Sequence, residues 1–327
     1  MSRSRTAGVT RTPPLHLVGL GATGPEDVVF DGLGRVLTGV GDGRLLRIEL
    51  PRTPGSAATV HEVGRTAGRP LGLEALPDGR LLVCDARRGL LRIDPDGTSA
   101  AEVLADSVAG TPLRFCSNAV AASDGTVYFT VSSRRYGLEH WLSDIVEHRP
   151  TGLLARLVPG GEPEVLLDEL HFANGVALAP DESYLVVAET GARRLTRRWL
   201  TGPGAGGHDT FADDLPGFPD NMSRTPRGGF WVALASPRNP ALDWLHRAAP
   251  PVRRATATAT RHLPDLPPRA ARVLEVDTRG RVVRRLRGAG ERYRMATGVA
   301  EHAGRLVLGS LAEGAVAWCD LGEPGAV

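Results

Sequence analysis

Short apolar runs alternate with tight-turn signals along most of the chain. The runs are rich in Val, Leu, Ile, Tyr, Phe and Trp, and Asp-Gly, Gly-Gly or Pro-Asp pairs separate them. This pattern predicts short antiparallel strands joined by hairpins, with few long helices.

The same unit recurs six times. Each copy has an apolar stretch, a Gly-containing turn, a β-rich run and a second polar turn before a further strand. The copies begin near Gly24, Arg69, Phe115, Phe172, Phe218 and Ala296. A meander of roughly 45 residues cannot bury both of its faces alone, but six of them stacked around an axis can. We therefore predict an all-β fold, a six-bladed β-propeller that forms one domain over residues 15–322. Leu15–Leu20 would complete the sixth blade, and residues 1–14 would be a flexible N-terminal segment.

Two stretches interrupt the repeat and predict helical inserts in blades three and five. Residues 135–150 carry apolar side chains at three- and four-residue spacing, as in an amphipathic helix. Residues 237–271 contain NPALDWLHRAAPPVRR, which predicts a short helix followed by Pro-rich and Ala/Thr-rich connections. Either insert could serve as a substrate lid or as surface packing.

One position of the repeat lies at the inner end of the first strand, where the blades converge on the axis. It recurs about every 46 residues wherever no insert intervenes. The residues at this position are Glu26, Gly72, Asn118, Asn174, Asp220 and Thr297, with Asn221 as an alternative in the fifth copy. Four of the six carry carboxylate or amide oxygens, and none is His or Cys.

Such donors are typical of a calcium site. Ca²⁺ takes carboxylate and amide oxygens, whereas Zn²⁺ favours nitrogen and sulfur. Two carboxylates would repel each other in a narrow channel without a cation. The repeat thus predicts one Ca²⁺ held by Glu26, Asn118, Asn174 and Asp220. The alternative is ordinary turn chemistry, because Asn-Gly and Pro-Asp-Asn are also common in turns.

Composition excludes several classes of function. All 39 basic residues are arginine, so the chain has neither a Schiff-base lysine nor a Walker-type phosphate loop. The net charge of +2 is spread along the chain and predicts no nucleic-acid or membrane surface, so we expect a small-molecule partner. No apolar stretch approaches the ~20 residues of a membrane span, and the start has no signal-peptide core, so we expect a cytoplasmic protein. The three cysteines match no metal-ligand spacing.

The residues around the axial positions resemble a known family. It is the strictosidine-synthase-like branch of the calcium-dependent phosphotriesterase superfamily, which is related to gluconolactonases and paraoxonases. The resemblance extends from Gly24 to Leu321. The segments that carry it are GPEDVVFD, SNAVAASDGTVYFTVSSRR, HWLSDIVEHRPTGLLAR, FANGVALAPDESYLVVAETGARRLTRRWLTGPGAG and LPGFPDNM.

The resemblance implies a six-bladed propeller with a catalytic Ca²⁺ in its central tunnel, held by a Glu, two Asn and an Asp. Carried over to this chain, these ligands are Glu26, Asn118, Asn174 and Asp220, the set that the repeat also selects. In hydrolytic relatives the cation polarises a carbonyl or phosphoryl oxygen. Asp220 is therefore the candidate nucleophile or general base.

Two positions depart from the family pattern. Strictosidine synthases carry a catalytic Glu in the sixth blade where this chain has Thr297, so amine condensation with an aldehyde is not expected. Paraoxonases carry a His pair near blades two and three, and residues 111–116 contain no His. Proton transfer would then depend on Asp220, on a water held at the ion or on His140. The residues that could support the ion or contact the substrate are Asn221, Thr297, His140, His171 and Trp141.

We therefore predict a calcium-dependent hydrolase of a lactone or carboxylic ester. Two alternatives stay open. One is a natural-product biosynthetic enzyme that catalyses a cyclisation or condensation on the same scaffold. The other is a non-catalytic propeller that binds a ligand and uses its ion only for stability.

Overall fold

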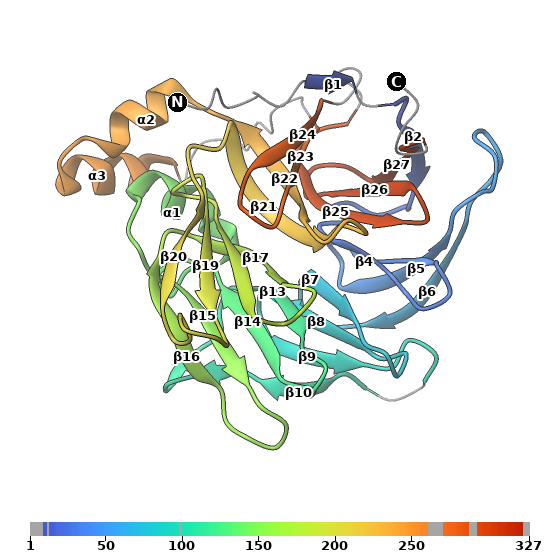
Figure 1. Ribbon diagram of the computed structural model, residues 1–327, viewed down its shortest axis with the longest axis horizontal. Helices are drawn as coiled ribbons and strands as arrows, with labels where there is room; N and C mark the ends of the chain where they lie inside the picture. Colours follow the sequence, from blue (N-terminus) through green and yellow to red (C-terminus); the bar gives the residue numbers. More distant parts are fainter. Residues whose placement is uncertain (1–8, 12, 98–99, 261–270, 288–292, 323–327) are drawn as a thin grey trace.

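The computed structural model describes residues 9–11, 13–97, 100–260, 271–287 and 293–322. Six sheets, each built on an antiparallel meander, form a ring, which confirms the predicted all-β class and the six-bladed propeller (Figure 1). Blades one to three are β3 (Val28–Phe30), β4 (Val36–Gly39), β5 (Arg44–Glu49) and β6 (Thr59–Arg65); β7 (Pro70–Ala75), β8 (Leu81–Asp85), β9 (Gly89–Ile93) and β10 (Glu102–Ala105); β13 (Cys116–Ala121), β14 (Val127–Val131), β15 (Gly152–Leu157) and β16 (Glu164–Leu170). A short hairpin, β11 (Ser107–Val108) and β12 (Thr111–Pro112), connects the second blade to the third.

The remaining blades follow the same meander. They are β17 (Ala173–Leu178), β18 (Tyr184–Glu189), β19 (Arg194–Trp199) and β20 (His208–Ala212); β21 (Gly217–Arg224), β22 (Phe230–Pro237), β23 (Arg272–Val276) and β24 (Val282–Arg287); β25 (Ala296–His302), β26 (Arg305–Ser310) and β27 (Ala315–Asp320). The first strand of each blade contacts the first strands of both neighbours, so these six strands surround the axis.

The N-terminal region completes two sheets. Strand β2 (His16–Gly19) pairs antiparallel with β27 and becomes the outermost strand of blade six, as predicted for Leu15–Leu20. Strand β1 (Val9–Arg11) pairs parallel with β24 of blade five. Residues 1–8 and 12 of the segment predicted to be flexible lie outside the described residues.

Six apolar clusters hold the ring together, and each draws its buried side chains from two neighbouring blades. Phe230 packs between blades four and five, and Trp231 packs between blades five and six. Both are fully buried, as are Phe129 and Trp318 at other interfaces. The alternating strand pattern therefore buries one face of each sheet against each neighbour.

Both helical inserts join the second and third strands of their blades. The first contains a 3₁₀ turn, Leu138–His140, and helix α1 (Trp141–Glu147). The second contains α2 (Pro240–His246), and Asn239 caps α2 by accepting hydrogen bonds from two backbone N–H groups of its first turn. Among the described helices, none is long and apolar enough to cross a membrane. The predicted cytoplasmic location stays a prediction.

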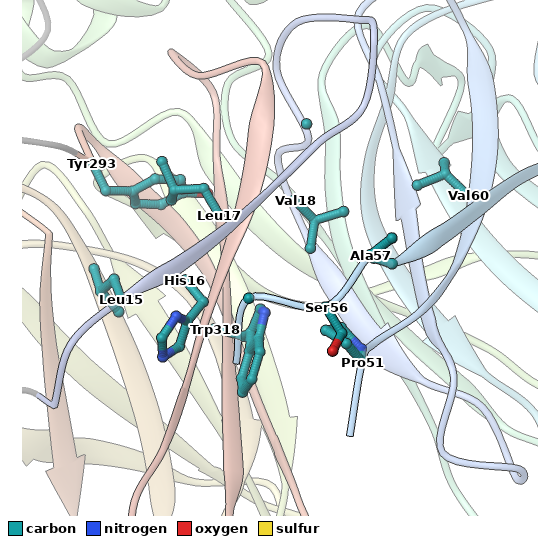
Figure 2. Close-up of a pocket in the computed structure, with 13 residues that line it drawn as sticks. Leu15, His16, Leu17, Val18, Pro51, Ser56, Ala57, Val60, Tyr293 and Trp318 are labelled. Atoms are coloured by element: carbon teal, nitrogen blue, oxygen red, sulfur yellow. The ribbon is translucent and has the colours of Figure 1, made fainter. Parts of the chain in front are cut away.

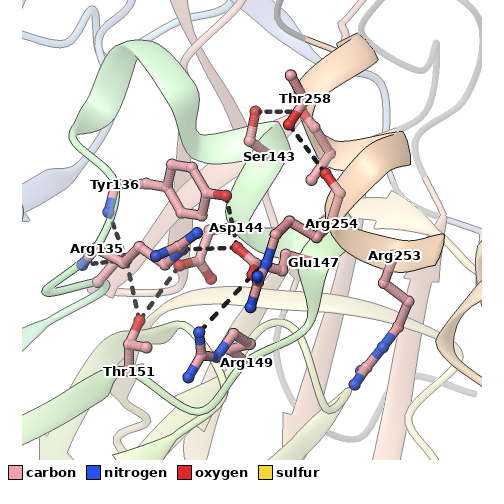
Figure 3. Close-up of polar contacts among 12 residues, drawn as sticks. Arg135, Tyr136, Ser143, Asp144, Glu147, Arg149, Thr151, Arg253, Arg254 and Thr258 are labelled. Carbon is pink, nitrogen blue, oxygen red and sulfur yellow. Dashed lines mark hydrogen bonds and ion pairs between the residues drawn. The ribbon is translucent and has the colours of Figure 1, made fainter. Parts of the chain in front are cut away.

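A further helix, α3 (Pro250–Thr260), forms where the sequence predicted only connections. Two prolines open it, at positions where a helix has no use for the missing N–H. Tertiary packing overcomes the weak helix propensity of its threonines: Ala257 is buried, and its carbonyl accepts a hydrogen bond from Ser143 Oγ of α1 at 3.0 Å. Figure 3 shows α1 and α3 side by side, with Arg254 of α3 and Arg135 both directed at the buried Glu147.

Candidate active site in the central tunnel

The inner strands change register where the predicted axial residues lie. In β13, Ser117 and Asn118 together oppose a single residue of β14, and the same bulge occurs in β17 at Asn174 and in β21 at Asp220 and Asn221. A bulge adds one residue to one strand and re-aims its side chains. In β13 and β21 the bulge places two consecutive polar side chains near the axis, whereas in β17 the residue after Asn174 is Gly175.

Glycines allow the inner strands to approach this closely. A Cβ added to Gly175 would lie 2.5 Å from the carbonyl oxygen of Asp220, and one added to Gly72 would lie 2.5 Å from the Cα of Asn118. Gly72 therefore stands at the axial position of blade two because the backbone of blade three occupies the space of a side chain.

A cavity of about 440 Å³ lies above the axial residues. Its floor includes Glu26, Asn174, Asp220 and Thr297. Its walls are mostly apolar and come from the first residues of the inner strands, from the residues just before these strands and from both inserts. The wall residues include Leu71, Phe115, Leu138, Trp141, Leu142, Ile145, Phe172, Phe218 and Leu242. The inserts therefore contribute directly to the cavity wall.

Hydrogen bonds across the axis connect the floor residues. Asn118 Nδ2 donates to Asp27 Oδ2 at 3.1 Å and to Asn221 Oδ1 at 3.0 Å, and Asn221 Nδ2 donates to Glu26 Oε1 at 3.0 Å. Side chains from blades one, three and five thus form one buried chain. Because the amides are donors to the acids, the orientation of each amide is fixed.

Asn174 is held from two sides. Ser117 Oγ donates to its Oδ1 at 3.0 Å, and its Nδ2 donates to Thr190 Oγ1 at 3.3 Å. The Thr190 hydroxyl donates in turn to the carbonyl of Pro219 at 2.6 Å. The amide oxygen of Asn174 keeps one lone pair for a further partner.

The floor concentrates negative charge away from water. Burial, the charge of Asp220 and then that of Asp27 raise the pKa of Glu26 well above its ordinary value. Burial and the charge of Asp27 raise the pKa of Asp220 to about 8, and burial raises the pKa of Asp27 to about 7. The positive charge of Arg69 lowers the pKa of Glu26 and so offsets part of this rise. The Arg69 N–H groups, however, donate to the backbone carbonyls of Pro70 and Gly24.

The residues on the floor fit a hard cation. Glu26 Oε2 and Asp220 Oδ1 are buried and have no hydrogen-bond partner in the described part of the chain. A cation would supply the positive partner that both oxygens lack. Asn174 Oδ1 is an oxygen ligand of the kind that Ca²⁺ also takes. No group of three or more His, Cys, Asp or Glu among the described residues is placed to hold a metal ion, so any site depends on the amides as well.

The structure brings most of the predicted site residues together. Glu26, Asn174 and Asp220 border the cavity, whereas Asn118 lies beneath them in the hydrogen-bonded chain. The fifth blade contributes both of its alternatives, since Asp220 faces the cavity and Asn221 bridges Asn118 to Glu26.

The supporting candidates divide into two groups. Thr297 and Trp141 line the cavity, and the Thr297 hydroxyl donates to the backbone carbonyl of Glu26 at 2.6 Å. His140 is exposed and His171 stacks on another histidine, and neither lines the cavity. Sequence reasoning missed Asp27, Ser117 and Thr190. Ser117 reaches the site through the bulge in β13, whereas Asp27 directly precedes β3 and Thr190 follows β18, outside the repeat position that was counted.

A second cavity, of about 580 Å³, lies at the outer edge of blade six (Figure 2). Its walls include Leu17, Tyr293 and Trp318, and the His16 ring lies 4.7 Å from the indole of Trp318 at a tilt of 39°. None of its lining residues is acidic, so it lacks the charge that the tunnel floor carries.

The three cysteines are free and buried.

Comparison with known proteins identifies the family. Residues 118–203 match the family model described as strictosidine synthase, and residues 14–48 match the one described as strictosidine synthase-like, N-terminal. Strictosidine synthase-like protein 2 of Arabidopsis thaliana is 37% identical over 257 residues, which cover 70% of this chain and 68% of that protein. The chain belongs to the strictosidine synthase-like family.

Other relatives of this strictosidine synthase-like protein are longer. Adipocyte plasma membrane-associated protein of Mus musculus is 37% identical over 235 residues, and the match covers 68% of this chain and 56% of that protein. The matches to its rat and salmon counterparts cover 62% and 56% of those proteins.

Solved propellers share the fold at lower identity. A gluconolactonase from Xanthomonas campestris has a TM-score of 0.63 at 19% identity, with 97% of this chain and 99% of that one covered. A calcium-binding protein, regucalcin, from Agrobacterium tumefaciens has a TM-score of 0.62 at 15% identity, with 95% of each chain covered. Likeness at this level shows the fold alone.

Proposed function

We propose that this strictosidine synthase-like protein is a calcium-dependent hydrolase of a lactone or carboxylic ester. The observation that supports it most is the pair of buried carboxylate oxygens, Glu26 Oε2 and Asp220 Oδ1, without partners at the floor of an apolar-walled cavity. Unpaired buried carboxylates are costly, so a site that retains them is a candidate for cation binding and for chemistry. The gluconolactonase and regucalcin neighbours are consistent with this class.

Glu26, Asn118, Asn174 and Asp220 would hold the cation, with Asn221 available beside them. A divalent cation bound there would polarise the carbonyl oxygen of the substrate and favour the ionised form of the surrounding acids. Asn118 would need to bind through Oδ1, because its Nδ2 already donates to Asp27 and Asn221.

The chain's own residues would perform the remaining steps. The apolar walls bind the hydrocarbon part of the substrate and exclude bulk water. The Asp220 carboxylate accepts a proton from the attacking water while the water oxygen bonds to the carbonyl carbon. The proton then passes to the leaving alkoxide as the ester C–O bond breaks, which yields an acid and an alcohol, or one hydroxy acid from a lactone.

The test is hydrolysis of a panel of lactones and aryl esters before and after chelation. We expect activity that falls on chelation, returns with added calcium, and is lost in Asp220→Ala. Glu162→Gln, which changes an exposed carboxylate, is the matched control and should keep full activity.

Three outcomes would separate the alternatives. Turnover that is indifferent to chelation and to Asp220→Ala contradicts the mechanism. Calcium that raises the melting temperature without any turnover favours the non-catalytic propeller. Conversion of a polycyclic precursor in the absence of hydrolysis favours a biosynthetic cyclase or condensing enzyme.

A further inference from the structure

Three histidines form a continuous stack outside the cavity. His148 is the C-cap of α1, His171 lies between β16 and β17, and His246 ends α2. The ring centroids of His148 and His171 are 4.3 Å apart at 24°, and those of His148 and His246 are 3.9 Å apart at 11°. His148 is therefore the middle ring.

The stack joins the three segments that form one side of the cavity. The apolar wall contains Ile145 of α1, Leu242 of α2 and Phe172, which follows His171 in the chain. His246 Nε2 also lies 2.8 Å from the carbonyl oxygen of Ile145, which ties the end of α2 to α1. Movement of any one ring would displace a part of the wall.

The surroundings of the stack favour uncharged rings. Nδ1 of His148 and Nδ1 of His171 are buried without a hydrogen-bond partner among the described residues. Arg253 of α3 donates to the His148 carbonyl at 3.1 Å. Burial, the two flanking histidines, Arg253 and Arg193 lower the pKa of His148 to about 3.

The outer rings differ from the middle one. Burial lowers the pKa of both His171 and His246, although Glu189 acts in the opposite direction at His171, as do the Ile145 carbonyl and Asp243 at His246. Arg194 and Arg253 add to the lowering at His171, and Arg193 and Arg253 add to it at His246. All three rings thus resist protonation while they are stacked.

We propose that the three stacked histidines are a pH-sensitive lock that holds α1 and α2 in place as the wall of the tunnel cavity and releases them on acidification. The inference does not depend on the proposed hydrolase activity, because it concerns the position of the two helices. Like charges on parallel rings at this separation repel, so protonation opposes the stack directly.

The direction of the pH effect on the stack follows from the pKa difference between a stacked ring and a released ring. A ring released into solvent has a pKa near 6.5, and the stacked ring has a lower one. The stack is fully stable above about pH 6.5, and its population relative to the open form falls by up to about tenfold per pH unit for each histidine that takes up a proton. For His148 this window runs from about 6.5 down to about 3.

Asp144 of α1 has the opposite effect on the pH dependence of helix packing. Burial raises its pKa to about 7, so its protonation in the same range favours the packed helix. The contribution of the histidines is therefore isolated by comparing variants, and not by the wild-type profile alone.

The experiment is hydrogen exchange of the full chain at about pH 7.5 and pH 5.5, corrected for the intrinsic exchange rate. We expect the opening constant of peptides over α1 and α2 to rise at least about tenfold on acidification, while strand β8 stays protected. His148→Phe keeps an aromatic ring in the middle position without a titrating group and should retain less than half of that logarithmic change. The control is His208→Phe, since His208 is exposed on β20, and it should match the wild type.

Two results would overturn the proposal. One is equal protection of α1 and α2 at both pH values in the wild type. The other is a pH response in His148→Phe that equals that of the wild type. If His148→Phe does not fold, His246→Phe at the end of the stack gives the same comparison, and an undiminished response there also refutes the lock.

Discussion

Replacement of Asp220 by Asn should stabilise the metal-free protein. Asp220 is buried, and burial together with the charge of Asp27 raises its pKa from 3.8 to about 8. In the unfolded chain the carboxyl ionises near 3.8, so at about pH 7.5 folding must protonate it or leave it charged without water. Asn has nearly the same shape and carries no such cost.

The magnitude follows from the pKa difference. Each pH unit between 3.8 and the assay pH corresponds to about 1.4 kcal/mol, which sets an upper bound of about 5 kcal/mol at about pH 7.5. Local relaxation and water entry reduce this, and we expect a gain of about 2–4 kcal/mol. The folded pKa is the higher one, so the wild-type contribution is favourable below about pH 4 and is lost as the pH rises toward 8. The gain on substitution therefore grows over the same range.

The assay is thermal unfolding in chelator and in calcium at about pH 5 and pH 7.5. In chelator at the higher pH, Asp220→Asn should melt several degrees above the wild type. In calcium at a thousandfold excess over Kd the order of the two melting temperatures should reverse, because the wild type gains about 4.1 kcal/mol of binding energy and the variant does not. Glu162→Gln should follow the wild type throughout. A variant that melts below the wild type in chelator at both pH values would refute the electrostatic argument.

Three further outcomes follow from the structure. Because burial raises the pKa of Asp27 to about 7 and of Asp220 to about 8, calcium affinity should rise with pH up to about tenfold per unit per displaced proton, and a flat titration between about pH 6 and 8 would contradict this. Gly175→Ala should cost about 2 kcal/mol or more in denaturant unfolding, because its Cβ would meet the Asp220 carbonyl, whereas Gly19→Ala has open space and serves as the control. Phe230→Ala should cost about 3–5 kcal/mol in the same assay, and a loss below about 1 kcal/mol would show that the blade interface collapses into the vacated volume.

The fold was accessible from the sequence because every blade repeats the same local chemistry. Alternating apolar residues and Gly-containing turns specify a meander, and a meander with two apolar faces requires neighbours on both sides. Helix α3 was not accessible in this way. Its Pro, Ala and Thr residues have no strong local preference, and its conformation depends on packing of Ala257 against Ser143 in a distant insert.

The candidate site was only partly predictable. Counting along the repeat selects Glu26, Asn118, Asn174 and Asp220, but it cannot show that a bulge also turns a neighbouring residue toward the axis. Spacing carries no information about the histidine stack either, because His148, His171 and His246 come from three separate connections and meet only when the blades are assembled.

Pairing of β2 with β27 has a consequence for biosynthesis. The outermost strand of blade six, β2, is synthesised before the first five blades, and its partner β27 is synthesised after them. Until then the first five blades can stack but the circle stays open, with an apolar sheet face exposed on blade one and on blade five and with β2 unpaired. Binding at the axis requires donors from blades on both sides of that opening, so the pocket can mature only after the last strand has been made.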